Sequence, residues 1–349
     1  MRRISRITAA GAATASLALA LSACGSTSTS SSSSESKDDK GLAIAYDVGG
    51  RGDQSFNDAA YAGLEQVKKE FGYQTADVEP TDGETDADKE QRLVSLARQG
   101  YNPVVGVGYA YASAVKGAAE KYPDTTFGIV DDATIEADNV ADLVFSEEQA
   151  SYLAGVAAAE STKTNVVGFV GGVDIPLIHK FRAGFEQGVK DTDPKVKVIP
   201  QFLTQTAEEG GFSSPDKGKS AAEGQIEKKA DVIYAAAGLS GQGVIEAAAA
   251  NKVWAIGVDS DQYQQEALAP YKDWILTSAM KDVAKAVYNL AKSVEEGKPA
   301  TGIVKGDLKT GEVSLSNSNP KFADDAELQE AIEKAKEKIV SGEIKVKSS

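Results

Sequence analysis

The sequence is poor in the residues that form covalent cross-links and tight metal sites. It contains one cysteine, Cys24, and one histidine, His179, among 349 residues. A single cysteine excludes a disulfide within the chain, and one cysteine with one histidine cannot supply the four ligands of a structural zinc site. We therefore expect no metal site and no cofactor, and we expect packing to stabilise the folded chain.

Basic residues are also scarce relative to acidic ones. The chain has 37 lysines and arginines against 52 aspartates and glutamates, which gives a formal net charge of −15. Three of the basic residues, Arg2, Arg3 and Arg6, lie within the first seven positions. A surface with this excess of negative charge repels nucleic acids and anionic lipid head groups. The composition therefore predicts no nucleic-acid partner and no membrane binding through a basic patch.

The N-terminus carries the features of an export signal. The basic residues of Met1–Ile7 precede a small-residue apolar run, Thr8–Leu21, which is shorter than the roughly 20 residues of a membrane-spanning helix. The run ends in Leu21-Ser22-Ala23-Cys24, which resembles the bacterial lipobox. We expect residues 1–23 to be a signal peptide and Cys24 to carry lipid, which would anchor the protein on the extracytoplasmic face of the cell membrane. The alternative is an ordinary signal peptide with a chance cysteine.

The residues that follow the cysteine contain nothing that could be buried in a core. Gly25–Lys40 is dominated by serine and threonine and ends in Asp38-Asp39-Lys40. Such a composition is typical of a flexible tether. We therefore assign residues 24–40 to the lipidated cysteine and its tether, and the fold to the residues beyond them.

From Leu42 onward, short apolar runs alternate with amphipathic stretches. Apolar runs that barely alternate, separated by helical patterns, indicate parallel strands covered on both faces. The expected strands are Leu42–Tyr46, Pro103–Val107, Thr126–Val130, Val166–Val170, Val196–Phe202, Val232–Ala236, Val253–Val258, Trp274–Ala279 and Ile303–Leu308. The expected helices are Phe56–Phe71, Ala110–Lys121, Ile178–Lys190, Asp216–Lys229, Gly243–Asn251, Lys281–Glu296 and Asp324–Lys347. This α/β pattern fits two doubly wound lobes or one closed barrel of eight units.

Glycine and aspartate recur where the predicted strands end. The turns are Asp47–Asn57, Asp131-Asp132, Gly171–Pro176, Gly210–Pro215, Gly238–Gly243 and Gly257–Gln262. They form two clusters along the chain, which favours two lobes with a cleft between their strand ends. The first turn matches neither dinucleotide nor P-loop patterns, and its Asp47 and Asp53 would repel a phosphate. A simpler reading of this turn is a helix cap by Ser55 or Asp53.

Four motifs in order give the sequence a specific resemblance. They are Asp47 followed by Asp53-Gln54-Ser55-Phe56-Asn57, Gly168-Phe169-Val170-Gly171-Gly172-Val173-Asp174-Ile175-Pro176, Gly257-Val258-Asp259-Ser260-Asp261-Gln262, and Thr277-Ser278-Ala279-Met280-Lys281. Together they resemble the basic membrane protein family of ABC-transporter substrate-binding lipoproteins, which includes purine nucleoside receptors. The resemblance covers about Leu42 to Leu315.

The resemblance implies a type I periplasmic-binding-protein fold, with two Rossmann-like lobes joined by three crossovers. It places residues 41–148 and 277–303 in the N-terminal lobe, and residues 149–276 and 304–349 in the C-terminal lobe. It also implies a monomer that binds a nucleoside and delivers it to the subunits of an ABC permease.

The same resemblance implies a role for each candidate binding residue. Phe56 and Phe212 would stack on the base, Asp259 and Lys281 would hold the ribose hydroxyls, and Asp131 and Asn57 would reach the base edge. Asp47, Asp53 and Gly238 would lie in the same pocket. Gly238-Leu239-Ser240-Gly241 and the serines after Phe212 depart from the usual pattern, which leaves the identity of the ligand open.

Other functions remain as alternatives. A nucleoside hydrolase typically carries a dense aspartate cluster near its N-terminus, and here Gly49-Gly50-Arg51-Gly52 interrupts Asp47 and Asp53, so we expect no enzyme. A receptor for a sugar on the same fold, or a surface adhesin or sensor without transport, is compatible with the sequence.

Overall fold

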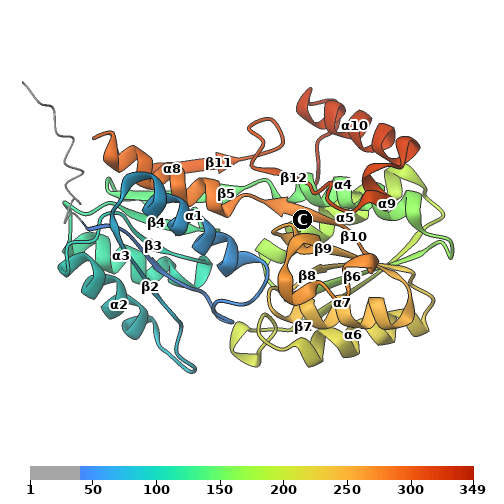
Figure 1. The fold of residues 1–349 in the computed structure, drawn as a ribbon, viewed down its shortest axis with the longest axis horizontal. Coiled ribbons are helices and arrows are strands. Elements are labelled where there is room, and N and C mark those ends of the chain that lie inside the picture. Colours follow the sequence, from blue (N-terminus) through green and yellow to red (C-terminus); the bar gives the residue numbers. More distant parts are fainter. Residues whose placement is uncertain (1–39) are drawn as a thin grey trace, which may run out of the picture. The chain divides into compact units, whose positions relative to one another are not determined.

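The structure is a computed structural model that describes residues 40–349 (Figure 1). The predicted signal peptide, Cys24 and nearly all of the predicted tether lie outside the described residues. The strands are β1 (Lys40–Ala45), β2 (Gln74–Val78), β3 (Val104–Gly106), β4 (Phe127–Val130), β5 (Val140–Phe145), β6 (Val166–Val173), β7 (Lys197–Thr204), β8 (Val232–Ala236), β9 (Trp254–Asp259), β10 (Ile275–Lys281), β11 (Gly302–Gly306) and β12 (Val313–Leu315). The helices are α1 (Phe56–Phe71), α2 (Asp86–Arg98), α3 (Ala112–Lys121), α4 (Glu147–Ser161), α5 (Pro176–Thr192), α6 (Pro215–Glu227), α7 (Ser240–Asn251), α8 (Val283–Glu295), α9 (Pro320–Ala323) and α10 (Ala326–Val340).

The strands form two open sheets of six strands each. Their orders are β11-β5-β4-β3-β1-β2 in the first lobe and β12-β10-β9-β8-β6-β7 in the second. All neighbouring strands run parallel except β12, which is antiparallel to β10. The predicted fold of two Rossmann-like lobes is therefore confirmed, and the closed barrel is wrong.

The inner strands are buried because helices cover both faces of each sheet. Every residue of β3, β4 and β8 is buried. In the first lobe α2 packs on α3 and α1 packs on α8, while in the second lobe α4 packs on α5 and α6 on α7 (Figure 1). This coverage explains why the inner strands are nearly continuous apolar runs.

The chain passes between the two sheets three times. The passages follow β5, β10 and β11 and lead into α4, α8 and β12 respectively. The strand pairing places two of the lobe boundaries at other residues than expected. β10 remains hydrogen-bonded within the second sheet through Lys281, and β11 pairs with β5 of the first sheet through Gly306. Residues 277–281 thus belong to the second sheet and residues 304–306 to the first, because a strand leaves its sheet only where its hydrogen-bond ladder ends.

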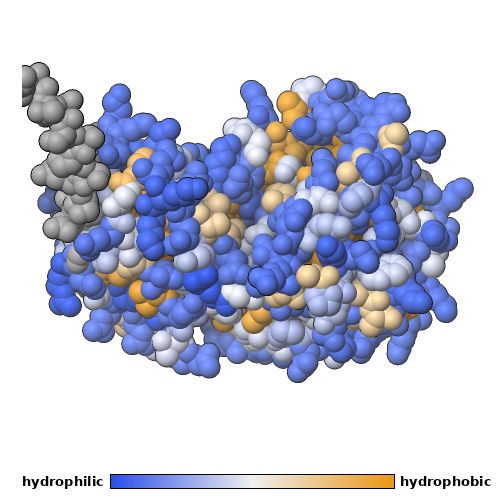
Figure 2. Space-filling model, viewed as in Figure 1, coloured by the Kyte–Doolittle hydropathy of each residue, from blue (hydrophilic) through white to orange (hydrophobic). Residues whose placement is uncertain are grey.

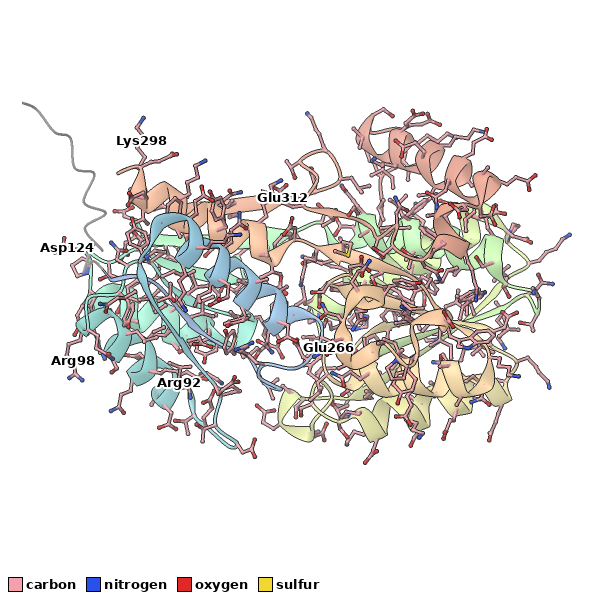
Figure 3. The ribbon with its side chains drawn as sticks, viewed as in Figure 1. Arg92, Arg98, Asp124, Glu266, Lys298 and Glu312 are labelled. Atoms are coloured by element: carbon pink, nitrogen blue, oxygen red, sulfur yellow. The ribbon has the colours of Figure 1, made fainter. Side chains whose placement is uncertain are left out.

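Hydrogen bonds join the three passages to one another. The Ser146 N–H donates to the Gly306 carbonyl at 2.9 Å, and the Asp282 N–H donates to the carbonyl of Glu312 at 2.7 Å. Glu312, labelled in Figure 3, lies on the third passage between β11 and β12. Backbone hydrogen bonds therefore connect the three passages beside the strand ends.

Candidate ligand-binding site

One pocket lies between the two lobes and is lined by all nine predicted binding residues. It encloses about 540 Å³ of empty space, counting solvent at its mouth. The predicted residues in its wall are Asp47, Asp53, Phe56, Asn57, Asp131, Phe212, Gly238, Asp259 and Lys281. The wall also contains residues that the sequence did not single out, namely Val48, Gly108, Tyr109, Leu177, Ile178, Phe181, Ala236, Ala237 and Val258.

Asp53 lies in the pocket wall, but both of its carboxylate oxygens are occupied by backbone. Oδ1 accepts hydrogen bonds from the N–H groups of Ser55 at 3.0 Å and Asp58 at 3.1 Å, and Oδ2 accepts from the Asn57 N–H at 2.8 Å. These are N–H groups of the first turn of α1, which have no partner within the helix. Asp53 therefore caps α1 and positions the side chains that this helix presents to the pocket.

Asp47 follows β1 and lines the pocket together with Asn57. The Asp47 N–H donates to Asn57 Oδ1 at 3.0 Å, and Asp47 Oδ1 accepts from the Val48 N–H at 2.8 Å. Gly108 lies against this carboxylate: a Cβ at that position would lie 2.3 Å from Asp47 Oδ2. Burial, helped by the charges of Asp131 and Asp53, raises the pKa of Asp47 to about 7. Near neutral pH this carboxyl can thus accept or donate a hydrogen bond.

The pocket wall also holds a buried charge cluster. Lys281 Nζ lies 2.6 Å from Asp131 Oδ2 and 3.5 Å from Asp259 Oδ1, and the three side chains are 4%, 3% and 8% exposed. Asp131 Oδ1 and Asp259 Oδ1 are buried without a hydrogen-bond partner among the described residues. An unpaired buried oxygen is costly, so both atoms are suited to accept hydrogen bonds from a ligand.

Both aspartates of the cluster have left-handed backbone. Asp131 follows β4 with φ of 67°, and Asp259 ends β9 with φ of 62°. Left-handed backbone is uncommon outside glycine and concentrates at functional sites. The carboxyl ends of one strand in each lobe therefore turn an acidic side chain into the cleft.

Glu147 adds a further carboxylate that the sequence analysis missed. It opens α4, its side chain is 1% exposed, and its Oε2 lies 3.3 Å from Lys180 Nζ. Burial and the charge of Asp131 raise the pKa of Glu147 to about 7. Burial on its own would lower the pKa of Lys281, but the nearby carboxylates of Asp131, Asp259 and Glu147 raise it above its ordinary value. Lys281 is therefore a cation surrounded by more than one negative charge.

Two phenylalanines provide aromatic wall from opposite lobes. Phe56 begins α1 of the first lobe, and Lys281 Nζ lies 4.5 Å from the centre of its ring. Phe212 belongs to the second lobe, where its ring packs against Gly172 so closely that a Cβ on this glycine would lie 2.4 Å from Phe212 Cδ1. Leu177, Ile178 and Phe181 of α5 extend the apolar wall, and their helical spacing is the signal that could have identified them.

The described part of the chain shows neither a membrane-spanning helix nor a metal cluster. Among residues 40–349, no helix combines the length and apolar character that crossing a bilayer requires. Within the same range, no three His, Cys, Asp or Glu side chains are grouped so that they could hold a metal ion. The surface in Figure 2 is largely hydrophilic.

Comparison with known proteins places this architecture in a family. Residues 41–349 match the family described as ABC transporter substrate-binding protein PnrA-like. The chain is 35% identical to the ABC transporter nucleoside-binding protein BmpA of Lactococcus lactis, over 89% of this chain and 90% of that protein. It is also 35% identical to an uncharacterised lipoprotein of Pyrococcus abyssi, over 77% of this chain and 67% of that protein.

A solved structure supports the same assignment. The structure of an ABC transporter solute-binding protein from Aeropyrum pernix superposes with a TM-score of 0.76 at 29% identity, covering 89% of this chain and 94% of that one. The predicted resemblance is thereby confirmed. The chain belongs to the family of PnrA-like ABC transporter substrate-binding proteins.

Proposed function

We propose that the chain binds purine nucleosides between its lobes and delivers them to an ABC permease. The observation that carries the proposal is the composition of the pocket. Aromatic rings from both lobes, Phe56 and Phe212, share it with a charged group that has two unpartnered carboxylate oxygens. A nucleoside has the same two parts, a base with two π faces and a ribose with hydroxyl donors. The name of the Lactococcus lactis relative, a nucleoside-binding protein, agrees with this proposal.

In the proposed complex, the two phenylalanine rings stack on the base and the charge cluster binds the ribose. Stacking of a base on an aromatic side chain contributes about 1–3 kcal/mol. Asp259 and Lys281 hold the hydroxyls, and Asp131 joins them, because its Oδ2 lies 2.6 Å from Lys281 Nζ. The family resemblance would instead place Asp131 at the base edge. We assign that edge to Asn57 and Asp47, which are joined by a hydrogen bond in the pocket wall.

The charges of the pocket disfavour a phosphorylated ligand. Asp47, Asp131 and Asp259 line it together with a single lysine, Lys281. The α1 N-terminus, which could otherwise bind a phosphate, already has Asp53 as its cap. Nucleosides should therefore bind more tightly than their monophosphates.

Calorimetric titration of the ligand-free protein tests the proposal. We expect adenosine, guanosine or inosine to bind, their monophosphates to bind more weakly, and D-ribose to bind weakly because it lacks the base. Asp259→Ala should lower nucleoside affinity at least about 30-fold, since truncating one partner of a buried charged pair costs about 2–5 kcal/mol. Asp132→Ala is the matched control: it removes a neighbouring carboxylate that, among residues 40–349, bonds only Thr134. Ribose binding as tightly as any nucleoside, or a monophosphate binding best, would contradict the proposal.

We extend the proposal to the attachment of the protein. Cys24 would carry the lipid and hold a monomeric receptor at the extracytoplasmic face of the membrane, beside its permease. The lipobox-like Leu21-Ser22-Ala23-Cys24 and the lipoprotein name of the Pyrococcus abyssi relative support this. Cys24→Ala should appear in the soluble fraction or as unprocessed precursor. A fully processed variant that still sediments with membranes would exclude a Cys24 anchor.

A further inference from the structure

Ser55 connects the two lobes at the pocket. It precedes α1 in the first lobe and is fully buried. Its Oγ donates to Asp259 Oδ2 of the second lobe at 2.8 Å and lies 3.4 Å from the Val258 carbonyl. A serine before a helix commonly caps it, but the Ser55 side chain makes no capping bond, because Asp53 occupies those N–H groups. The hydroxyl of Ser55 is thus available to the other lobe.

Because of the bond to Ser55, the two carboxylate oxygens of Asp259 have different surroundings. Oδ2 accepts from Ser55, whereas Oδ1 lies 3.5 Å from Lys281 Nζ and has no hydrogen-bond partner among the described residues. A hydrogen bond at one oxygen restricts the rotation of the carboxylate, and with it the direction of the other oxygen. That direction is toward the lysine that lines the same pocket.

We propose that Ser55 is a positioning residue, which orients Asp259 for the sugar hydroxyls of the ligand when the lobes close. This inference rests on the proposed nucleoside function. Because Ser55 and Asp259 belong to different lobes, their hydrogen bond exists only while the lobes are together. Asp259 is then oriented for binding only in the closed conformation, which gives that conformation a higher affinity than the open one.

Two backbone carbonyls next to the hydroxyl of Ser55 accept further hydrogen bonds from the second lobe. The carbonyl of Ser55 accepts from Ser260 Oγ at 2.8 Å, and the carbonyl of Gln54 accepts from Gln262 Nε2 at 3.1 Å. Gln54 has left-handed backbone, with φ of 55°. These bonds also join the lobes, but they touch no carboxylate. Removing one of these bonds therefore weakens lobe closure but leaves the hydrogen bond between Ser55 and Asp259 in place.

The experiment compares Ser55→Ala with Ser260→Ala, using guanosine and 2′,3′-dideoxyguanosine as probes in calorimetric titrations. Each variant removes one hydroxyl bond of 2.8 Å between the lobes. Ser55→Ala should lower guanosine affinity about 10- to 100-fold, as expected for a hydrogen bond to a charged group. Ser260→Ala should lower it only about 2- to 10-fold. The loss of affinity in Ser55→Ala should be smaller for the dideoxynucleoside, which lacks the 2′- and 3′-hydroxyls, than for guanosine.

A third variant separates positioning from packing. Ser55→Cys keeps the volume of the side chain but supplies only a weak donor, so its guanosine affinity should fall between those of the wild type and Ser55→Ala. Equal losses of both probes in Ser55→Ala, or equal guanosine losses in Ser55→Ala and Ser260→Ala, would overturn the inference while the nucleoside function stands. Failure of the wild type to bind either probe would overturn the proposed function and this inference with it.

Discussion

Lys281 and Asp131 form an ion pair across the cleft, with Nζ and Oδ2 2.6 Å apart. Lys281 ends β10 of the second sheet, and Asp131 follows β4 of the first. The pair therefore holds the lobes together at the same place where the proposed ribose site lies. It leaves Asp131 Oδ1 without a partner, so the contact that closes the cleft also presents an acceptor to the ligand.

Removing the ammonium should destabilise the protein in a pH-dependent way. Lys281→Met leaves the buried carboxylates of Asp131 and Asp259 without a cation, and losing one partner of a buried pair costs about 3–5 kcal/mol. Without Lys281 the pKa of Asp131, already raised by burial, should rise further. A carboxyl with a raised pKa costs stability above that pKa, and the cost disappears as the pH falls. Urea unfolding should thus show a larger loss at pH 8 than at pH 5.

The control for this variant is Lys285→Met. Lys285 pairs with Glu312 at 2.9 Å, but its side chain is 42% exposed, so its loss should cost no more than about 1 kcal/mol. If Lys281→Met were equally destabilised at both pH values, uncompensated carboxylates would not be the cause.

Gly172 packs against the ring of Phe212, so a substitution there should change nucleoside affinity through the position of that ring. Gly172→Ala places a Cβ 2.4 Å from Phe212 Cδ1, so the ring must move. We expect nucleoside affinity to fall about tenfold, because a displaced ring loses most of a stacking contribution of about 1–3 kcal/mol. Gly224→Ala is the control, since no atom lies within 4 Å of its added Cβ. Unchanged affinity in Gly172→Ala would show that the position of Phe212 is unimportant for binding.

The sequence predicted most of the inner strands, but it missed β5, whose apolar run is interrupted by Asp142, and it missed elements whose pattern is weak. β8 is buried along its whole length, so its residues read as a continuous apolar run. In α4, by contrast, ten residues from Glu147 to Ala158 are buried around the helix, which removes the amphipathic period that would reveal it. β2 is an edge strand with exposed and half-buried residues, and it was also missed.

The sequence predicted which residues lie at the strand ends and line the site. It did not predict which of their side chains contact each other. Asp131 and Lys281 are separated by 150 positions and meet only because the lobes close on each other. Sequence motifs suggested Asp259 as the partner of Lys281, whereas the shorter contact is to Asp131. For the α1 cap, the spacing allowed either Ser55 or Asp53. The choice depends on Asp259 of the other lobe, which takes the hydroxyl of Ser55.

The capping role of Asp53 predicts a linked loss of stability and binding. Asp53→Ala removes the acceptor for three backbone N–H groups, which should cost the ligand-free protein about 1–2 kcal/mol. Nucleoside affinity should also fall, because α1 carries Phe56 and Asn57. Asp325→Ala removes the cap of α10, whose side chain accepts from the Leu328 N–H. It should destabilise the protein by about 1 kcal/mol and leave binding unchanged. A loss of affinity in Asp53→Ala without any loss of stability would instead mark Asp53 as a direct ligand contact.

Asp47 should make the stability of the ligand-free protein fall as the pH rises. Burial raises its pKa from the ordinary 3.8 to about 7 in the folded state. Below about pH 4 the group is protonated in both states and has no effect. Between about pH 4 and 7 the unfolded chain loses this proton while the folded chain keeps it, so the free energy of unfolding decreases. Glu147, with a pKa raised to about 7, and Asp53, with a pKa raised to about 6, act in the same direction.

Asp47→Asn removes the largest of these contributions from the pocket itself. Relative to the wild type, the variant should gain on the order of 1–3 kcal/mol between pH 4 and pH 8, because it no longer has a charge to bury. Urea unfolding of ligand-free protein across this range measures the difference. Asp124→Asn, at an exposed position labelled in Figure 3, is the control and should change the free energy of unfolding by no more than about 0.5 kcal/mol. If the gain of Asp47→Asn were the same at pH 4 and pH 8, the ionisation of Asp47 would not be linked to folding, and its raised pKa could not govern which hydrogen bond it makes to a base.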